Sequence, residues 1–303
     1  MYFPLVRGKQ FELVALRELA CIVNDRKFKP IIEPVRDNYT PLVKTIQLLN
    51  KNNIVPLVII NPSLGDFKDH ERNIIDEILK ISDSVKYIPC LKVKEFREEY
   101  ERILSSLKGK KAVYIFDKLD SMKMSLLKNV DFVLVPSDSP TRALASLDNV
   151  ILIDDAFKKE KKNADYSSES YFSDLHVSYL NNSKNIIGFG DYTIVGSDYS
   201  ESGGPAYVVT IHLSYIDHDN FDSMSVKHFS SKDNNSLVDP GGKFREALAL
   251  FYSFNLKYPK VFDLTEGKKE LLELHKKNHF PGLGILKKIS IKHHVETLCN
   301  FIK

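Results

Sequence analysis

Short apolar runs rich in β-branched residues recur along this chain, and each ends in a polar residue, a proline or a glycine. Each run is followed by a stretch with a helical pattern, as in residues 10–23 and 40–52. Near-continuous apolar strands that alternate with helices are typical of a parallel sheet buried on both faces. The runs are 2–8, 29–35, 55–62, 86–93, 111–117, 131–138, 149–155 and 185–191. Eight such units predict a closed (β/α)8 TIM-type barrel.

The gaps between these runs carry further helix signals. Thr40 followed by Pro41 predicts an N-cap and a first helical position. The remaining helices of the barrel are expected over 66–82, 94–109 and 139–147. The polar segment 158–185 is expected to be a loop with one short helix near 171–181, and long loops of this kind often carry function.

The pattern changes after the eighth run. Alternation by twos, with a turn at 217–220, predicts a β-hairpin over 206–231. Helical patterns follow at 239–255, 266–278 and 285–302. We therefore expect one barrel domain over 1–303, extended by the hairpin segment 192–239 and by C-terminal helices over 240–303 that pack on the barrel.

Composition narrows the class of protein. Hydrophobic residues make up 43% of the chain, and 43 basic residues against 40 acidic ones leave a net charge of +3, which does not favour nucleic-acid binding. No apolar span is long enough to cross a membrane, and the N-terminus lacks the order of a signal peptide. The three cysteines lie far apart, as reduced core thiols do. We expect a cytoplasmic protein without a membrane contact.

Polar side chains stand where the apolar runs end. Barrel enzymes work at the carboxyl ends of their strands, and strand-end side chains there converge on one axis. We therefore expect a polar pocket for a charged ligand at this end. The candidate ligand-binding residues are Arg7, Glu33, Asn61, Lys92, Asp117, Asp154, Asp155, Asp191 and Tyr192.

Two interpretations stay open for each strong candidate. Arg7 could hold a carboxylate or phosphate, or pair with Glu33 on the neighbouring strand. Glu33 could also act as a general base or metal ligand, since an unpaired buried carboxylate is costly. Asp117, Asp154 and Asp191 could hold Mg²⁺ or Mn²⁺, or cap the helices that follow.

Glycines and histidines near the last run add two further candidates. Gly188 and Gly190 permit a close backbone approach or a positive φ, and they could also bind phosphate after the eighth strand. His212 lies on one arm of the expected hairpin and His228 on the other, so that with Tyr215 they could face each other. They form either a ligand site or a cross-strand pair that only stabilises the hairpin.

Several blocks together resemble the bacterial and phage "beta protein" family. They are FPLVRGKQFELVALREL, KPIIEPV, IINPSLGDF, GFGDYTIV, AYVVTIHLSY, HFSS, GGKFREAL and FPGLGILKKISIKHH. The resemblance covers nearly the whole chain, and the family is found beside mobile-element and defence genes without an established reaction. It implies the fold and a setting in anti-phage defence, and it transfers no catalytic residue.

Three functions follow from these observations. The resemblance implies a protein that acts with a partner encoded nearby. The strand-end carboxylates, with Arg7 and Lys92, are compatible with a metal-assisted phosphodiesterase at the barrel mouth. The same mouth could instead bind a phosphorylated or nucleotide ligand as a sensor. Fold alone does not choose among them.

Overall fold

The computed structural model describes residues 1–68, 73–181, 184–201, 207–232 and 235–302. Contacts between backbones divide the chain into two compact units. Unit 1 comprises Met1–Asp154, Leu175–Asp191 and Ile302. Within the described residues, unit 2 comprises Asp155–Asp174 and Tyr192–Phe301. The chain therefore leaves unit 1 after Asp154, returns at Leu175 and leaves again after Asp191.

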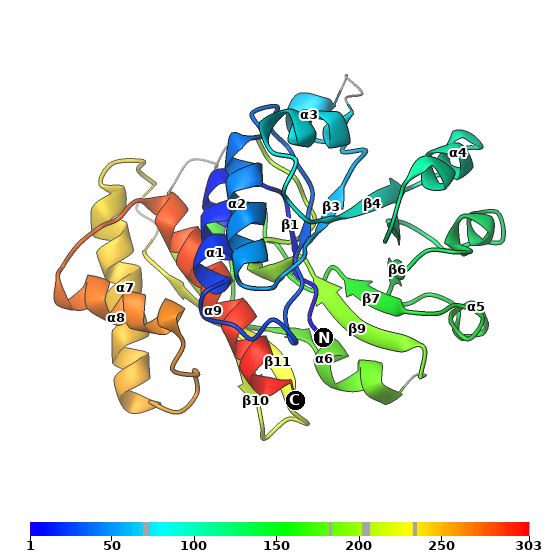
Figure 1. The fold of residues 1–303 in the computed structure, drawn as a ribbon. Helices are drawn as coiled ribbons and strands as arrows, with labels where there is room; N and C mark the ends of the chain where they lie inside the picture. The colour runs from blue at the N-terminus through cyan, green and yellow to red at the C-terminus, as the bar shows by residue number, and fades with distance from the viewer. Residues whose placement is uncertain (69–72, 182–183, 202–206, 233–234, 303) are drawn as a thin grey trace. The chain divides into compact units, whose positions relative to one another are not determined.

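Unit 1 is built on an eight-stranded parallel sheet whose strands follow one another in chain order (Figure 1). Strand β8 (Glu169–Ser173), which comes between the last two of them in the sequence, belongs to the sheet of unit 2. Each strand lies within a predicted run, although several are short. The strands are β1 (Leu5–Val6), β2 (Ile31–Ile32), β3 (Leu57–Ile59), β4 (Ile88–Val93), β5 (Ala112–Ile115), β6 (Phe132–Pro136), β7 (Val150–Asp154) and β9 (Ile186–Asp191).

The sheet closes between its first and last strands. Tyr2 bridges Phe189 in parallel, and the backbone N–H of Phe3 donates to the Phe189 carbonyl oxygen at 2.8 Å. The rings of Tyr2 and Phe189 stack with centroids 5.2 Å apart. Closure of eight parallel strands confirms the (β/α)8 TIM-type barrel.

Helices alternate with these strands, but they are unequal. Helix α2 begins at Thr40 with Tyr39 as its N-cap, one residue before the predicted cap. After β5 and β6 the chain forms only short helical turns. The elements are α1 (Gln10–Leu19), α2 (Thr40–Lys51), η1 (Gly65–Phe67), α3 (Ile74–Ile81), α4 (Glu99–Ser106), η2 (Lys123–Leu127), α5 (Thr141–Leu144), α6 (Leu175–Ser178) and η4 (Tyr179–Asn181).

Unit 2 contains a three-stranded antiparallel sheet in the order β10-β11-β8. Strands β10 (Thr210–Asp217) and β11 (Ser223–Ser230) form the predicted hairpin. Strand β8 (Glu169–Ser173) was not predicted, because the segment 158–185 was expected to be a loop. The Gly-Gly-Pro at 203–205 lies outside the described residues.

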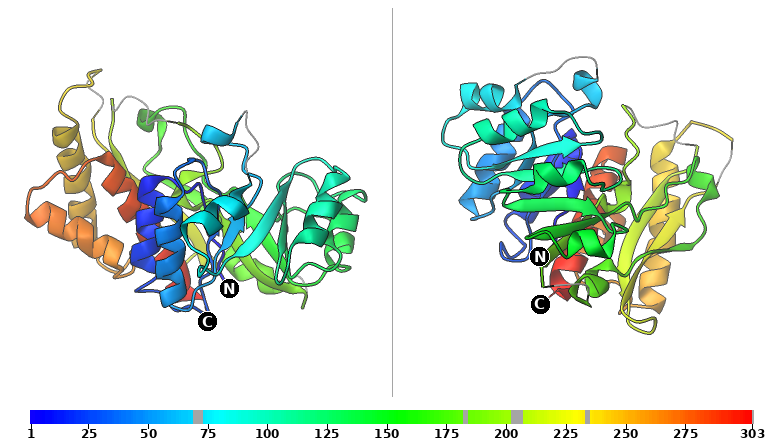
Figure 2. Two further views of the ribbon diagram at one scale, coloured as in Figure 1. Left: turned by 45° about the horizontal axis from the view of Figure 1, so that its top comes forward. Right: turned by 90° about the vertical axis from the view of Figure 1, so that its right-hand side faces the viewer.

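The remaining elements of unit 2 are helical. Figure 2 shows α7 running alongside the hairpin sheet. Phe229 of β11 packs with Phe244, Phe251 and Phe262 in an apolar core. The helices are η3 (Asn163–Asp165), η5 (Thr193–Val195), α7 (Pro240–Lys257), α8 (Glu266–Lys276) and α9 (Leu283–Phe301).

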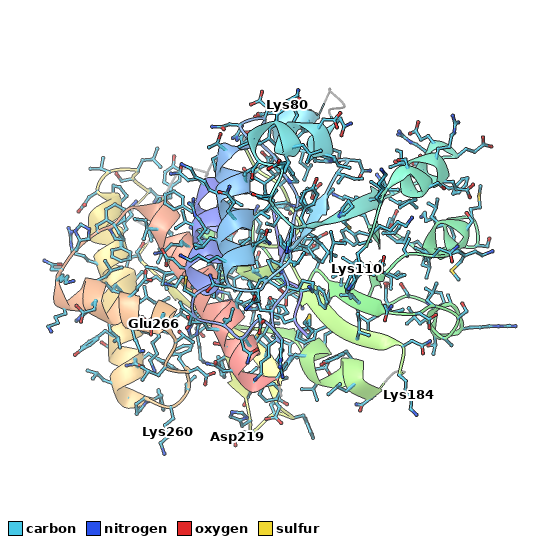
Figure 3. The ribbon with its side chains drawn as sticks, viewed as in Figure 1. Lys80, Lys110, Lys184, Asp219, Lys260 and Glu266 are labelled. Carbon is cyan, nitrogen blue, oxygen red and sulfur yellow. The ribbon has the colours of Figure 1, made fainter. Side chains whose placement is uncertain are left out.

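None of the helices in the described ranges is long and apolar enough to cross a membrane. Exposed lysines are spread over separate segments of the chain, among them Lys80, Lys110, Lys184 and Lys260 (Figure 3).

Candidate functional site

A buried ion cluster joins the carboxyl ends of three barrel strands. The Glu33 carboxylate accepts hydrogen bonds from the Arg7 guanidinium and, at 2.9 Å, from the Lys92 ammonium. The side chain of Glu33 is fully buried, and those of Arg7 and Lys92 are 6% and 10% exposed. The predicted contact between Arg7 and Glu33 is thus confirmed, and it follows from the pairing of β1 with β2.

The cluster satisfies its own charges. Burial lowers the pKa of Lys92, and the Glu33 carboxylate acts in the opposite direction. The Lys92 ammonium also lies 4.4 Å from the centroid of the Phe116 ring. A second buried carboxylate, Glu12, accepts from the Arg7 backbone N–H at 2.5 Å. Two cations and two carboxylates make this cluster a neutral clamp on the strand ends.

Asn61 fixes the backbone of β4 beside this cluster. Its amide donates to the Lys92 carbonyl oxygen at 2.7 Å, and its side-chain oxygen accepts from the Lys92 N–H at 2.8 Å. With these two bonds, the Asn61 side chain extends the hydrogen-bond ladder between β3 and β4 beyond the last residue of β3. Asn61 therefore has a positioning role in the strand pair.

The predicted carboxylates occupy different environments. In unit 1, Asp117 is exposed, while Asp191 is buried and accepts from the Tyr2 hydroxyl at 2.7 Å. Asp154 is half-buried and lies beside Asp191 in the register of β7 and β9. In unit 2, Asp155 accepts from the backbone N–H of Ser197 at 2.9 Å. Among the described residues, no group of three or more His, Cys, Asp or Glu side chains forms a metal site.

The last two candidates belong to unit 2. Tyr192 is buried and precedes η5. His212 faces His228 across the hairpin, as expected, with 2.7 Å between their Nδ1 atoms. Tyr215 does not join them, because strand alternation points it to the other face, where its ring packs against Phe262.

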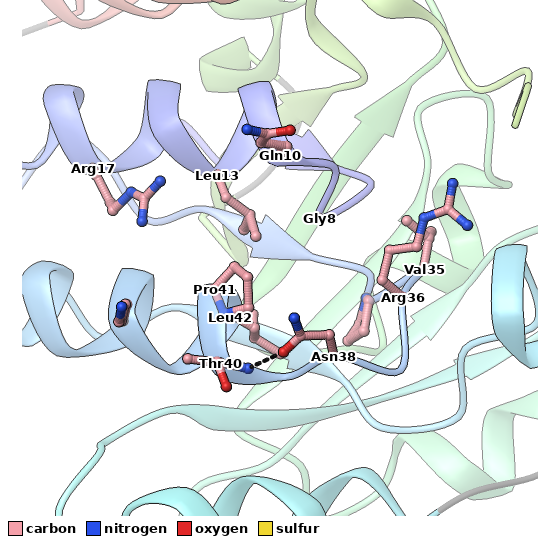
Figure 4. Close-up of a pocket in the computed structure, with 12 residues that line it drawn as sticks. Gly8, Gln10, Leu13, Arg17, Val35, Arg36, Asn38, Thr40, Pro41 and Leu42 are labelled. Atoms are coloured by element: carbon pink, nitrogen blue, oxygen red, sulfur yellow. Dashed lines mark hydrogen bonds between the residues drawn. The ribbon is translucent and has the colours of Figure 1, made fainter. Parts of the chain in front are cut away.

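A cavity of about 390 Å³ lies between α1 and α2, and the segments that lead from β1 and β2 into these helices complete its lining (Figure 4). Its polar lining includes Gln10 and Asn38 as well as three cations, Arg17, Arg36 and Lys44. Arg36 is held by Asp66 at 3.0 Å. None of the described residues that line the cavity is acidic.

Two helix N-termini border this cavity. Gln10 begins α1 and Thr40 begins α2, and neither N-cap side chain accepts a hydrogen bond from its helix. At α2, Asn38 Oδ1 accepts from the Thr40 N–H at 3.2 Å (Figure 4). The partial positive charge of a helix N-terminus favours anions. Leu13, Val35 and Leu42 supply apolar wall. The arrangement can hold a small ligand with an anionic group and an apolar or planar part.

Sequence reasoning missed this cavity. None of the ten predicted ligand residues lines it, although Arg7 and Glu33 immediately precede two lining residues, Gly8 and Pro34. The available signal was the basic residues Arg17 and Lys44, each within two turns of a helix start that follows a strand. Comparison with models of protein families, with curated proteins and with solved structures finds no match in any of the three. The resemblance to the beta protein family therefore stays a prediction.

Proposed function

We propose that this chain binds a small anionic ligand, a phosphorylated metabolite or a nucleotide, in the cavity between α1 and α2, and acts as its sensor. The carrying observation is a cavity of about 390 Å³ with three cationic side chains and no acidic residue in its described lining. Pockets for small molecules start at about this volume. Guanidinium groups bind phosphate through paired N–H donors.

We place the ligand in the cavity and not at the nearby ion cluster, because the charged groups of that cluster already pair with one another. Arg7 and Lys92 are already paired with Glu33, and among the cavity cations Arg36 is paired with Asp66 at 3.0 Å. The other two cations, Arg17 and Lys44, belong to a described lining that contains no acidic residue. A phosphate group would bring a negative charge to Arg17 and Lys44. Leu13 and Val35 could cover a sugar or a base.

The test compares a nucleotide with its unphosphorylated nucleoside and with the inorganic diphosphate alone. We expect ADP and inorganic pyrophosphate to raise the melting temperature, and adenosine to leave it unchanged. A ligand at ten times its Kd stabilises the native state by about 1.4 kcal/mol. The shift should shrink as salt screens the charges.

Matched variants locate the binding. Arg17→Gln with Lys44→Gln removes two lining cations and should abolish the shift. Arg26→Gln with Lys51→Gln removes two exposed cations outside the lining and should keep it. An equal shift in both double variants would place the anion elsewhere and refute the cavity.

The other functions stay sequence-based predictions. A metal-assisted phosphodiesterase using Mg²⁺ or Mn²⁺ rests on the strand-end carboxylates, of which Asp154 and Asp191 are register neighbours on β7 and β9. A protein partner from a bacterial defence module rests on the family resemblance. Co-purification of a neighbour-encoded protein with the tagged chain tests that prediction.

A further inference from the structure

Three polar side chains stand in a row across the sheet of unit 2. His212 of β10 lies directly opposite His228 of β11, and Ser170 of β8 lies opposite Val226, two residues from His228. Side chains two apart on a strand share a face. The pairing of β10, β11 and β8 therefore brings Ser170, His228 and His212 together from distant parts of the sequence.

The three side chains form one hydrogen-bonded chain. Ser170 Oγ lies 2.8 Å from His228 Nε2, and His228 Nδ1 lies 2.7 Å from His212 Nδ1. A neutral imidazole carries one N–H, so the Nδ1–Nδ1 contact requires the proton on one histidine only. With the proton on His228 Nδ1, His228 Nε2 is a lone pair and the Ser170 hydroxyl must donate to it.

The surroundings hold the base in place and keep it uncharged. The Tyr166 ring stacks on His228 with centroids 4.7 Å apart, and Phe157 meets His212 edge-on at 5.3 Å. Burial lowers the pKa of His228 to about 4, against the opposing Glu169 carboxylate. Ser170 itself is only partly buried. The Ser170 hydroxyl thus lies beside an oriented neutral imidazole, the pairing from which a serine nucleophile is activated. The lowered pKa makes His228 a weaker base than a free imidazole.

We propose that Ser170 is a nucleophile toward uncharged carboxylic esters, with His228 as its general base and His212 as a positioning residue. Ser170 Oγ forms a bond to the ester carbonyl carbon, and its proton moves to His228 Nε2. The bond from that carbon to the alcohol oxygen breaks, and His228 returns the proton to the departing alkoxide. Water then hydrolyses the acyl-serine, giving the carboxylic acid and restoring the hydroxyl.

Two features favour an uncharged ester. Aromatic rings and neutral imidazoles line the row, and the Glu169 carboxylate is bound by Lys227 and Tyr215. In this tautomer, His212 Nδ1 accepts a hydrogen bond from His228 Nδ1–H, but a neutral imidazole stabilises the His228 imidazolium less than a carboxylate does. We therefore expect slow turnover and efficient labelling by reactive probes.

The experiment treats the full chain with a fluorophosphonate probe, whose P–F bond breaks as Ser170 Oγ bonds to phosphorus. We expect one adduct by intact mass, mapped to Ser170 by peptide sequencing. Ser170→Ala should lose the adduct, and His228→Gln should slow labelling at least tenfold. Ser168→Ala, on the same segment, should label like the wild type.

Two results would overturn the proposal even if a variant fails to fold. The first is an absence of adduct on Ser170 in the wild-type chain. The second comes from ¹⁵N NMR of the imidazoles: a proton on His228 Nε2 would make Ser170 an acceptor and the row purely structural. For His212, the readout is the same spectrum, since His212→Phe should disturb the His228 tautomer and slow labelling while native circular dichroism is retained.

Discussion

Glu33 is the residue on which the carboxyl ends of β1, β2 and β4 depend. Glu33→Gln would leave Arg7 and Lys92 buried without their carboxylate. Breaking a buried pair in this way costs about 3–5 kcal/mol. We expect a clear fall in the urea midpoint of unfolding.

The control for this prediction is an exposed pair on α3. Glu77 bonds Lys80, whose side chain is 67% exposed, and such pairs contribute about 0–1 kcal/mol. Glu77→Gln should therefore move the midpoint little. If the two variants lost equal stability, the cluster would not be the clamp that its burial indicates.

Gly190 is required by the closeness of β9 to the first residues of the chain. A Cβ at this position would lie 2.2 Å from the Phe3 carbonyl oxygen and 2.8 Å from Ile153 Cδ1. The close backbone approach expected for the glycine pair is thus confirmed. Gly190→Ala should destabilise by about 1–3 kcal/mol or more through overpacking, measured as a loss in melting temperature.

Gly109 provides the comparison. A Cβ there meets nothing within 4 Å, and only its φ of +74° opposes alanine. Gly109→Ala should cost about 1 kcal/mol, the usual cost of left-handed backbone. A larger loss at Gly109 than at Gly190 would contradict the packing argument.

At the scale of elements, the hairpin tip carries local strain. Phe221 and Asp222 have φ values of 58° and 56°, and the Phe221 side chain is 92% exposed. Phe221→Gly removes the steric penalty of a left-handed residue and loses almost no packing. We expect stabilisation of about 0.5–1 kcal/mol in urea unfolding. Asp219→Gly, outside the left-handed region, should destabilise or have no effect.

The sequence predicted the barrel strands well because each has its own apolar run. It missed β8 because Glu169 and Ser170 are followed by Tyr171 and Phe172 without the polar–apolar alternation of a half-buried strand, and because the partner strand lies far along the chain. The helices after β5 and β6 were hard to place since only short turns form there. The sequence signal is strongest for the barrel strands, because a strand that is buried on both faces must be apolar along its whole length.

The candidate sites also differ in whether the sequence could predict them. The contact of Arg7 with Glu33 was predictable because neighbouring parallel strands end side by side. The cavity lined by Arg17 and Lys44 depends on how α1 and α2 pack against each other. A local sequence pattern does not predict this packing. The Ser170 row needs a strand pairing across the missed β8.

At the scale of the whole molecule, acid should destabilise the protein through three histidines of unit 2, of which His228 and His293 are buried and His212 is half-buried. Burial is the first cause that lowers their pKa, to about 3 for His212 and about 4 for His228 and His293. Below pH 6.5 the unfolded chain binds protons that the native chain does not. Stability should therefore fall from about pH 6.5 toward pH 4, by up to about 1.4 kcal/mol per pH unit for each histidine.

Urea midpoints between pH 7.5 and 5 measure this slope. His293→Met removes one of the three groups, so its midpoint should change less steeply with pH than that of the wild type. His279→Gln, at an exposed position, should keep the full slope. An unchanged slope in His293→Met would show that His293 is not a source of the acid sensitivity.

The interleaving of the two units matters during translation. A ribosome delivers β8 before the last barrel strand, while its partner β11 is made only after β9 and β10. Until β11 emerges, the backbone of β8 lacks that pairing strand, and an unpaired strand edge invites association with other chains. A nascent chain stalled before Thr210 should therefore be cut by protease near Glu169 more readily than the finished protein. Because β8 is synthesised before β11, a pause in translation between these two strands should increase the risk of aggregation. We expect chaperones to bind the nascent chain in this interval.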